Sequence, residues 1–379
     1  MRYLECSHLE KRPQPQPFSN VLSTFTTTDR LLRPKLAEAS RRKNEMSQFT
    51  FVDLFAGIGG TRVAYQSEGG ECVFSCEINE EAQEVYENNW GEPITEHDIR
   101  NVDVDVVPPH DLLLACWPCP SFSQMGKLDG LEDERGMLFY HIVEILKEQK
   151  PKAFMLENVK NLRFVKEGSA YETVRSTLED CGYVVFDEIL NALDFGLPQH
   201  RERLIIVGFR EDLAPDPDDF EMPTENENAL KTEDDQRAAL AAILEDDPKE
   251  KYFASEKVQS DRLNSVDNAQ NVPEPSVWHE NRNGLVTPRP YCGTLRASSS
   301  WHYLLINGKR NPTVRELLRL QGFPEWFEIS DSNRSRARRL TGNTVPVPMI
   351  HTVAETLIEE VGFANENTGE PDSLVVTND

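Results

Sequence analysis

The sequence lacks long hydrophobic runs and a surplus of basic residues. No stretch of about 18 apolar residues occurs, and the first ten residues contain no apolar segment of the kind that a secretory signal requires. Lys and Arg number 40 against 65 Asp and Glu, which gives a formal net charge of -25. These features argue against a membrane span and a secretory signal, and they predict a cytoplasmic location.

The cysteines do not form the pattern of a disulfide framework. There are seven of them, an odd number spread from Cys6 to Cys292. Such a pattern fits a reducing compartment, so each thiol needs an explanation of its own.

The acidic balance on its own argues against a nucleic-acid partner, because Lys and Arg neutralise phosphates. Many of the acids, however, fall between residues 216 and 247. An acidic surface also keeps a protein soluble in a high-salt cytoplasm. We therefore expect a halophilic, haloarchaeal source and activity that persists in multimolar salt; full activity only at low salt would contradict this expectation.

From Phe51 onward, short apolar runs alternate with helical stretches, which predicts an open, doubly wound α/β domain. Expected strands cover 51–55, 72–76, 111–115, 153–156, 183–189 and 204–209, and expected helices include 80–89, 137–147 and 170–181. After Arg210 the sequence is acidic and rich in proline up to about residue 290, with one helical piece near 237–244. This change predicts a smaller lobe or a large insertion. Residues 313–359 predict helix, loop and helix.

A glycine turn follows the first expected strand, in Asp53-Leu54-Phe55-Ala56-Gly57-Ile58-Gly59-Gly60. Glycines let a ligand approach the backbone, and free amides at a helix start favour polar groups. Glu77 ends the second strand about 20 residues on, where an acid can bind ribose hydroxyls. Asp98-Ile99 would suit an adenine. Each feature alone could be a plain turn or a solvated loop end; together they predict an adenosine-containing cofactor.

Cys116-Trp117-Pro118-Cys119 directly follows the expected strand 111–115. A CxxC pair after a strand is also typical of a thioredoxin-like redox site, and of half a zinc site. No second CxxC or paired histidines occur at ligand spacing, so we expect no metal. Glu157 ends the strand 153–156, and ligands bind at the carboxyl ends of such strands. We therefore expect Cys119 and Glu157 to face one crevice.

Two arginines enter the last expected strand in Gln199-His200-Arg201-Glu202-Arg203. Their spacing of two points both side chains to one face of the strand, which suits binding of a carbonyl oxygen or a phosphate. In isolation, the alternative is a surface ion-pair cluster with Glu202.

The order of these motifs, continued by Arg315-Glu316-Leu317-Leu318-Arg319-Leu320-Gln321-Gly322-Phe323-Pro324 and Gly342-Asn343-Thr344-Val345-Pro346, closely resembles the DNA cytosine-5 methyltransferases. The resemblance spans roughly 51–210 and 291–350. It implies a class I S-adenosylmethionine-dependent methyltransferase fold, Rossmann-like with a seven-stranded sheet, and a small inserted target-recognition lobe. The corresponding boundaries are 47–210 for the catalytic domain, 211–311 for the lobe, and 312–360 for a C-terminal segment that returns to the catalytic domain. Residues 1–46 are expected to be a disordered basic arm or a misassigned start, and 361–379 a disordered acidic tail.

The resemblance also implies the chemistry. Cys119 would add to carbon 6 of a flipped cytosine, Glu157 would share a proton with ring N3, and Arg203 with Arg201 would bind the base carbonyl. A polar loop over 123–135 would close over the base. S-adenosylmethionine would be contacted by Phe55, Gly57, Gly59, Glu77, Ile78, Asp98, Ile99, Pro118, Asn343 and Val345. Expected DNA contacts are Ser123, Thr294, Arg296, Arg334, Arg336 and Arg338, although the basic stretch 334–339 could also be a solvated helix.

The implied partner is double-stranded DNA, bound by a monomer; a restriction endonuclease encoded nearby would be a further partner. Trp117 and Pro120 depart from the family pattern, and neither removes a reacting group. Three alternatives stay open: a silent DNA-binding relative, an RNA-methylating enzyme, and a thiol-disulfide oxidoreductase. The tRNA-methylating branch carries a Cys-Phe-Thr element that is lacking here. An oxidoreductase would need Cys116, whereas a methyltransferase would tolerate Cys116→Ser.

Overall fold

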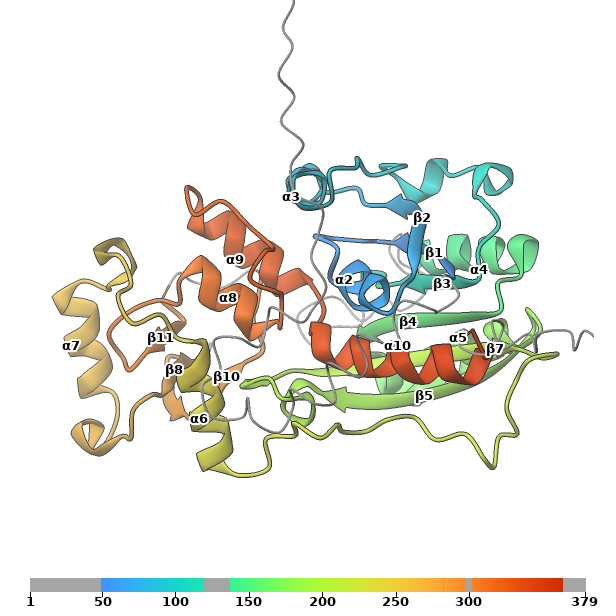
Figure 1. The fold of residues 1–379 in the computed structure, drawn as a ribbon. Coiled ribbons are helices and arrows are strands. Elements are labelled where there is room, and N and C mark those ends of the chain that lie inside the picture. The colour runs from blue at the N-terminus through green and yellow to red at the C-terminus, as the bar shows by residue number, and fades with distance from the viewer. Residues whose placement is uncertain (1–48, 119–136, 282, 298–301, 364–379) are drawn as a thin grey trace, which may run out of the picture.

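A computed structural model describes residues 49–118, 137–281, 283–297 and 302–363 (Figure 1). Its large lobe is built on a six-stranded sheet with the order β2-β1-β3-β4-β7-β5. These strands are β1 Thr50–Leu54, β2 Glu71–Cys76, β3 Leu112–Ala115, β4 Ala153–Val159, β5 Tyr183–Asn191 and β7 Glu202–Arg210. Only β7 runs against its neighbours, because it follows β5 through a short connection and pairs with both β4 and β5 in antiparallel register.

The strands are hydrophobic on both faces, and alternate residues enter two separate cores. In β4, for example, Ala153 and Met155 enter one core and Phe154 and Leu156 the other. This is the pattern of a sheet covered by helices on both sides. The first face packs against α2 (Gly60–Ser67), α3 (Glu80–Trp90) and α10 (Val347–Val361), and the second against α4 (Leu138–Gln149) and α5 (Ser169–Glu179).

The sheet differs from the expected one in two ways. Within the described residues it has six strands instead of seven, and Glu96 adds only a single parallel bridge to Cys76 at the outer edge of β2. Few residues separate the end of α3 from the short 3-10 turn at Ile99–Asn101, which limits pairing there to one bridge. The sheet is also mixed, since β7 is antiparallel.

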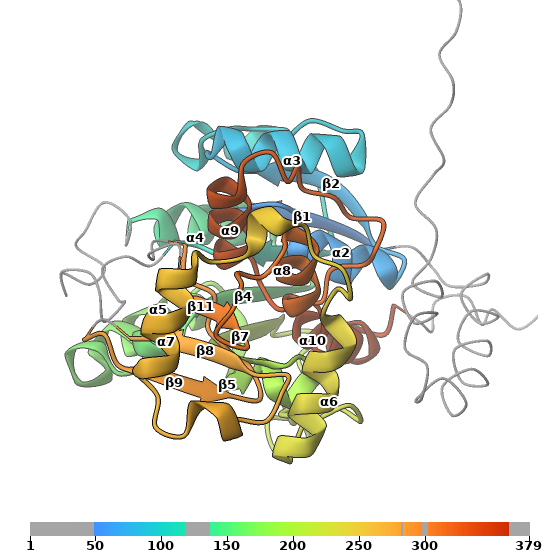
Figure 2. The same ribbon diagram turned by 90° about the vertical axis from the view of Figure 1, so that its left-hand side faces the viewer.

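A smaller lobe lies beside the carboxyl ends of the parallel strands (Figure 1), and it faces the viewer in Figure 2. Its three-stranded antiparallel sheet has the order β11-β8-β9, and a two-stranded parallel pair, β6 with β10, connects it to the large lobe. Helices α6 and α7 belong to this lobe. The bounds are β6 Gln199–His200, α6 Glu233–Ile243, α7 Glu256–Asn264, β8 Val277–Glu280, β9 Val286–Arg289, β10 Cys292–Gly293 and β11 Leu304–Ile306.

The C-terminal segment forms α8 (Val314–Leu320), α9 (Arg334–Asn343) and α10. Helix α8 belongs to both lobes: Leu317 and Leu320 enter the core of the small lobe, whereas Val314 and Leu318 enter that of the large one. Helix α10 packs against α2, so the chain returns to the helix that follows β1 (Figure 1).

One expected boundary changes in the structure. Residues 361–363, which were expected to belong to a disordered tail, are part of the fold: Val361 ends α10, and Phe363 is buried and stacks on Phe49 with ring centroids 5.2 Å apart. Residues 1–46, expected to be a disordered arm, and the rest of the tail lie outside the described residues. In the described part of the chain, no helix is long and apolar enough to cross a membrane.

Candidate active site

The glycine turn after β1 contains three residues in left-handed conformations. Phe55 and Gly57 both have φ 56°, and Gly59 has φ 90°. A bulky side chain such as that of Phe55 rarely adopts a positive φ, and such strain is often found at functional sites. A Cβ at Gly57 would meet no atom within 4 Å, whereas one at Gly59 would lie 2.6 Å from Trp90 Nε1. The turn is therefore packed against α3 at Gly59 and open at Gly57.

Buried hydrogen bonds between β1 and α2 hold this turn in place. Thr61 Oγ1 donates to both carboxylate oxygens of Asp53, at 2.8 and 2.9 Å, and ties the first turn of α2 to the end of β1. Burial raises the pKa of Asp53 to about 7, although the hydrogen bond from Thr61 opposes this shift. Asp53 thus supports the turn and does not face the crevice, since it is fully buried.

Glu77 is placed where the sequence predicted a ribose contact. Its carboxylate accepts from the backbone N–H groups of Gly57, at 2.8 Å, and Asn79, at 2.7 Å. Burial raises the pKa of Glu77, and these hydrogen bonds oppose the shift. The neighbouring Ile78 exposes 59% of its surface. A carboxylate beside an exposed aliphatic side chain at the glycine turn suits the ribose and adenine of one nucleoside.

Two further predicted cofactor contacts come from the next loop. Arg100 binds the carboxylate of Asp98 through Nε and Nη2, at 2.9 and 2.6 Å, and lowers the pKa of Asp98. Ile99 is buried in the core beneath the second sheet face. The Asp98 carboxylate already has a guanidinium partner, so the contact with an adenine amino group stays a prediction.

The two ends of the chain meet at the glycine turn. A Cβ on Gly60 would lie 2.6 Å from Thr344 Oγ1 and 3.0 Å from Val345 Cγ2. Val345 is buried and its neighbour Asn343 is exposed at the end of α9. The expectation that the C-terminal segment returns to the catalytic domain is confirmed here by Thr344 and Val345, whereas the contacts of Asn343 and Val345 with the cofactor stay predictions.

These residues fit S-adenosylmethionine. Glu77 and the turn amides would hold the ribose, Ile78 would cover the adenine, and the space beside Gly57 leaves the backbone accessible to the ligand.

Replacing Glu77 by Ala should weaken S-adenosylmethionine binding by about 10- to 100-fold, because a charged acceptor of ribose hydroxyls contributes roughly 1.5–3 kcal/mol. Isothermal titration calorimetry of the purified protein measures this. Glu71→Ala, at the exposed start of the same strand, is the matched control and should bind normally. Unchanged affinity in Glu77→Ala would remove the ribose assignment.

The strand β3 leads directly to the expected nucleophile. Pro118 is exposed, and Cys119, Pro120 and Ser123, together with the expected loop 123–135, lie outside the described residues. Burial raises the pKa of Cys116 well above its ordinary value, and the Glu157 carboxylate raises it further. A thiol of this kind is a poor source of thiolate. Trp117, a departure from the family pattern, is a core residue: it is buried and its ring lies 5.8 Å from that of Phe139.

Glu157 and Arg203 form an ion pair where the end of β4 meets the start of β7. Because β4 and β7 are antiparallel, the end of β4 lies beside the start of β7, and Val159 is opposite Arg203. Arg203 Nε is 2.8 Å from Glu157 Oε1, and both side chains are nearly buried. Burial lowers the pKa of Arg203, and the Glu157 carboxylate opposes this. The pair presents a carboxyl and a guanidinium side by side, an arrangement that the sequence did not predict.

Arg201 is placed differently from Arg203. Its guanidinium is buried and donates to the backbone oxygens of Leu295, Gly342 and Thr344. Burial and the like charge of Arg203 lower the pKa of Arg201 well below its ordinary value. Its two Nη groups are used within the protein, whereas its buried Nε has no hydrogen-bond partner among the described residues. Direct contacts of Arg201 and Arg203 with a base stay predictions.

The predicted DNA contacts of the small lobe, Thr294 and Arg296, are engaged with protein partners. Thr294 Oγ1 donates to the backbone oxygen of His200 at 2.9 Å. Arg296 lies over the ring of Tyr303 and is 2.9 Å from Nε2 of His279. Burial, and then Arg296, lowers the pKa of His279 to about 4, so this imidazole is neutral and accepts.

The basic stretch on α9 is engaged with protein partners. Arg336 pairs with Glu84 and Arg339 with Glu81, both on α3, and Arg334 donates to the backbone of Lys251. These contacts attach α9 to α3 and to the small lobe. The phosphate contacts predicted for Arg334, Arg336 and Arg338 remain predictions.

Sequence reasoning gave no role to two buried glutamines of the quoted motifs. Gln199 Nε2 donates to the backbone oxygen of Leu320 at 2.7 Å, and Gln321 Nε2 to that of Thr341 at 2.6 Å. The sequence shows that both glutamines lie inside motifs, but their hydrogen-bond partners are distant in the chain and are identified only by the three-dimensional structure.

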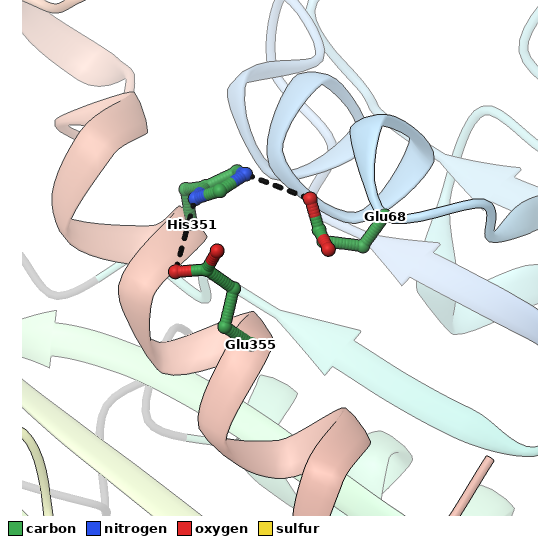
Figure 3. A group of neighbouring side chains, drawn as sticks. All are labelled: Glu68, His351 and Glu355. Carbon is green, nitrogen blue, oxygen red and sulfur yellow. Dashed lines mark hydrogen bonds and ion pairs between the residues drawn. The ribbon is translucent and has the colours of Figure 1, made fainter. Parts of the chain in front are cut away.

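A separate group of ionisable side chains lies between the end of α2 and α10. Its members, Glu68, His351 and Glu355, are close enough together to hold a metal ion. Figure 3 shows the imidazole between the two carboxylates, with Nε2 2.9 Å from Glu68 and Nδ1 3.5 Å from Glu355. A metal ion would gather its ligands at one ring nitrogen, whereas here each nitrogen has its own acid. This arrangement suits a protonated histidine that joins α10 to the end of α2.

The stability of the protein should depend on pH through His351. Burial lowers the pKa of His351, but hydrogen bonds with Glu355 and Glu68 outweigh it and raise the pKa to about 9. Because this pKa lies above the value of about 6.5 in the unfolded chain, protonated His351 stabilises the folded state. The stabilisation is complete below pH 6.5 and is lost as the pH rises through 9. Thermal melts should show His351→Gln about 2–4 °C below the wild type at pH 6 and equal to it at pH 10. A difference independent of pH would contradict this.

The fold and the site together define the class. A sheet of this order, with a glycine turn after β1, an acid at the end of β2 and a C-terminal segment folded onto the turn, is that of a class I S-adenosylmethionine-dependent methyltransferase. The structure is similar to that of a Dnmt2 methyltransferase from S. pombe, with a TM-score of 0.61 and 24% identity over 83% of this chain and 99% of that one. It is likewise similar to a putative DNA modification methyltransferase encoded within an E. coli prophage, with a TM-score of 0.60 at 18% identity over 82% and 99% of the two chains.

The family follows from the sequence comparisons. The family model for the C-5 cytosine-specific DNA methylases matches residues 49–359. The chain is 43% identical to the type II methyltransferase M.HaeII of Haemophilus aegyptius, over 84% of this chain and 96% of the relative. It is 45% identical to M.NgoBI of Neisseria gonorrhoeae, over 79% and 90% of the two chains. The chain belongs to the C-5 cytosine-specific DNA methylase family: it is a DNA cytosine-5 methyltransferase that uses S-adenosylmethionine. The RNA-methylating and oxidoreductase alternatives are not supported.

Proposed function

We propose that the enzyme methylates cytosine in duplex DNA through a covalent adduct on Cys119, with Glu157 and Arg203 acting on the base. The observation that carries this assignment is the Glu157–Arg203 pair, which is nearly buried at the edge of the sheet where β3 ends and leads to Cys119. A buried carboxyl and guanidinium are costly to desolvate, which favours a functional reason for both.

In the proposed reaction, the Cys119 thiolate adds to carbon 6 of the flipped base while Glu157 delivers a proton to ring N3. Carbon 5 then has enamine character. Arg203 binds the base carbonyl and stabilises the charge that develops on the ring. S-adenosylmethionine, when bound, supplies the electrophilic methyl group. Loss of the carbon 5 proton expels the Cys119 thiolate, and ring N3 returns its proton to Glu157, which restores the aromatic ring of the neutral base.

The wider setting is proposed from the relatives and from the shape of the protein. We assign residues 211–311 to target recognition and 47–210 with 312–360 to catalysis, because the small lobe stands beside the carboxyl ends of the strands. The names of the relatives M.HaeII and M.NgoBI as type II methyltransferases support a role in a restriction-modification system with a cognate endonuclease. We further propose a cytoplasmic monomer.

Bisulfite sequencing of DNA from cells that express the protein tests this function. Protected cytosines should appear at one short recurring sequence and not elsewhere. Unchanged cytosines throughout, with folded protein present in the cells, would contradict the proposal. Cells that express Cys119→Ser provide the matched background.

A further inference from the structure

Gln199 and Arg201 hold one residue of the small lobe from two sides. Gln199 Oε1 accepts from the backbone N–H of Leu295, and Arg201 Nη1 donates to the backbone oxygen of the same residue, both at 3.3 Å. All three side chains are almost completely buried, and Leu295 belongs to the core of the small lobe. The β6–β10 pair is adjacent, with Cys292 opposite Gln199. This is a direct connection between the strand that carries Arg203 and the lobe.

The same guanidinium reaches the cofactor end of α9. Arg201 Nη1 and Nη2 each lie 3.2 Å from the backbone oxygen of Gly342, and Nη2 lies 2.6 Å from that of Thr344. These two carbonyls flank Asn343, which ends α9. The last carbonyls of a helix lack partners within the helix and carry partial negative charge, so a buried cation is well placed to cap them.

The lobe and α9 also touch at the same point without a side chain between them. A Cβ on Gly342 would lie 2.8 Å from the backbone nitrogen of Ala297 and 3.1 Å from the carbonyl carbon of Arg296. The backbone of the lobe therefore rests on Gly342, one residue before Asn343. A shift of the lobe would displace the end of α9, and Arg201 binds both partners of that contact.

We propose that Arg201 is a positioning residue that couples the target-recognition lobe to the cofactor-binding end of α9, so that DNA and the cofactor strengthen each other's binding through it. This inference rests on the proposed function, because it takes the small lobe as the DNA-binding element and Asn343 with Val345 as cofactor contacts. It assigns Arg201 a role distinct from that of Arg203: Arg203 acts on the base, and Arg201 acts through the two segments that it joins.

Coupling between two ligands is reciprocal and is measured as a ratio of dissociation constants. The probe is S-adenosylhomocysteine, the demethylated form of the cofactor, which permits no turnover. Its dissociation constant is measured by calorimetry without DNA and with a saturating duplex that carries the sequence found by bisulfite mapping. The ratio of the two constants should be about 10 or more in the wild-type enzyme, within the usual range of about 5- to 150-fold.

In Arg201→Ala the ratio should fall to about 1, and in Arg201→Lys, which keeps a cation that can reach one or two carbonyls, it should recover in part. Gln199→Ala removes the hydrogen bond that Gln199 accepts from the backbone of Leu295, and it should reduce the ratio as well. This second variant tests the coupling if Arg201→Ala fails to fold. Arg262→Ala is the matched control: Arg262 is a buried arginine of the small lobe that binds Glu280 and the His302 backbone and touches neither Gly342 nor Thr344. It should lower the melting temperature and keep the ratio.

The inference would be overturned if Arg201→Ala and Gln199→Ala both kept the ratio of the wild-type enzyme. If Arg201→Ala kept that ratio but lowered the methyl-transfer rate more than about 100-fold, Arg201 would be placed on the base instead. A ratio near 1 in the wild-type enzyme itself would also overturn the inference. These outcomes differ from a failure of the proposed function, in which the wild-type enzyme itself would leave no methylated cytosine to map.

Discussion

Replacing Cys119 by Ser should lower the rate of methyl transfer by about 10⁴-fold or more, the scale on which loss of an enzyme's nucleophile is felt. A hydroxyl is a far weaker nucleophile toward carbon 6 than a thiolate at neutral pH. Binding should persist, because the cofactor contacts proposed above lie at the glycine turn and at the end of α9. The rate is measured with labelled S-adenosylmethionine and duplex DNA in a single turnover.

Cys116→Ser is the matched control, since it makes the same atomic change three residues away. Burial raises the pKa of Cys116 well above its ordinary value, so this thiol does not supply a thiolate, and activity should stay within about tenfold of the wild type. Loss of activity in Cys116→Ser equal to that in Cys119→Ser would contradict the assignment and favour chemistry that uses both thiols.

The second large effect is expected at the Glu157–Arg203 pair. Glu157→Gln keeps the shape of the side chain but cannot deliver a proton, so kcat should fall by about 10²- to 10⁴-fold. Arg203→Lys keeps the charge but loses the fork that binds Glu157 and the base carbonyl, and kcat should fall by about 10²- to 10³-fold. Because the two act together, the double variant should lose much less than the product of the single losses.

Glu202→Gln controls for charge at this strand start. Glu202 lies between the two arginines in sequence, but it pairs with the half-exposed Lys160, and such pairs contribute at most about 1 kcal/mol. Its kcat should stay within about twofold of the wild type. Thermal melts of all variants separate lost chemistry from lost stability. A kcat for Glu157→Gln near that of the wild type would rule out Glu157 as the proton donor.

The sequence predicted the strands of the large lobe to within a few residues because each is an apolar run with a turn at its end. For β4, the predicted 153–156 became Ala153–Val159, and the extension carries Glu157 itself. Glu77 and Glu157 could be placed at one edge of the sheet because each follows or ends a parallel strand, and ligands bind where parallel strands end. Applying that rule requires only the position of each residue relative to the strand beside it in the sequence.

What the sequence did not indicate depends on contacts between distant segments. The antiparallel direction of β7, which brings Arg203 beside Glu157, follows from tertiary pairing. Arg201 and Arg203 share a motif and were predicted to share a strand face, yet Arg201 lies between β6 and β7 and donates to three backbone oxygens. Arg203 binds the Glu157 carboxylate and the backbone oxygen of Glu202. The arginines of α9 were predicted to bind phosphates on charge alone, but Arg336 and Arg339 bind acids of α3, which lies about 250 residues earlier.

The central claim is a covalent bond between Cys119 and carbon 6 of cytosine, and trapping that bond tests it most directly. The test uses a duplex in which 5-fluorocytosine replaces the target base. Carbon 5 then carries fluorine, which cannot leave as a proton does, so Cys119 is not expelled and the adduct should persist. After incubation with S-adenosylmethionine and proteolysis, mass spectrometry should find the modified base on the peptide that contains Cys119, and no adduct with Cys119→Ser. An adduct on Cys116, or none at all with the active wild-type enzyme, would contradict the account.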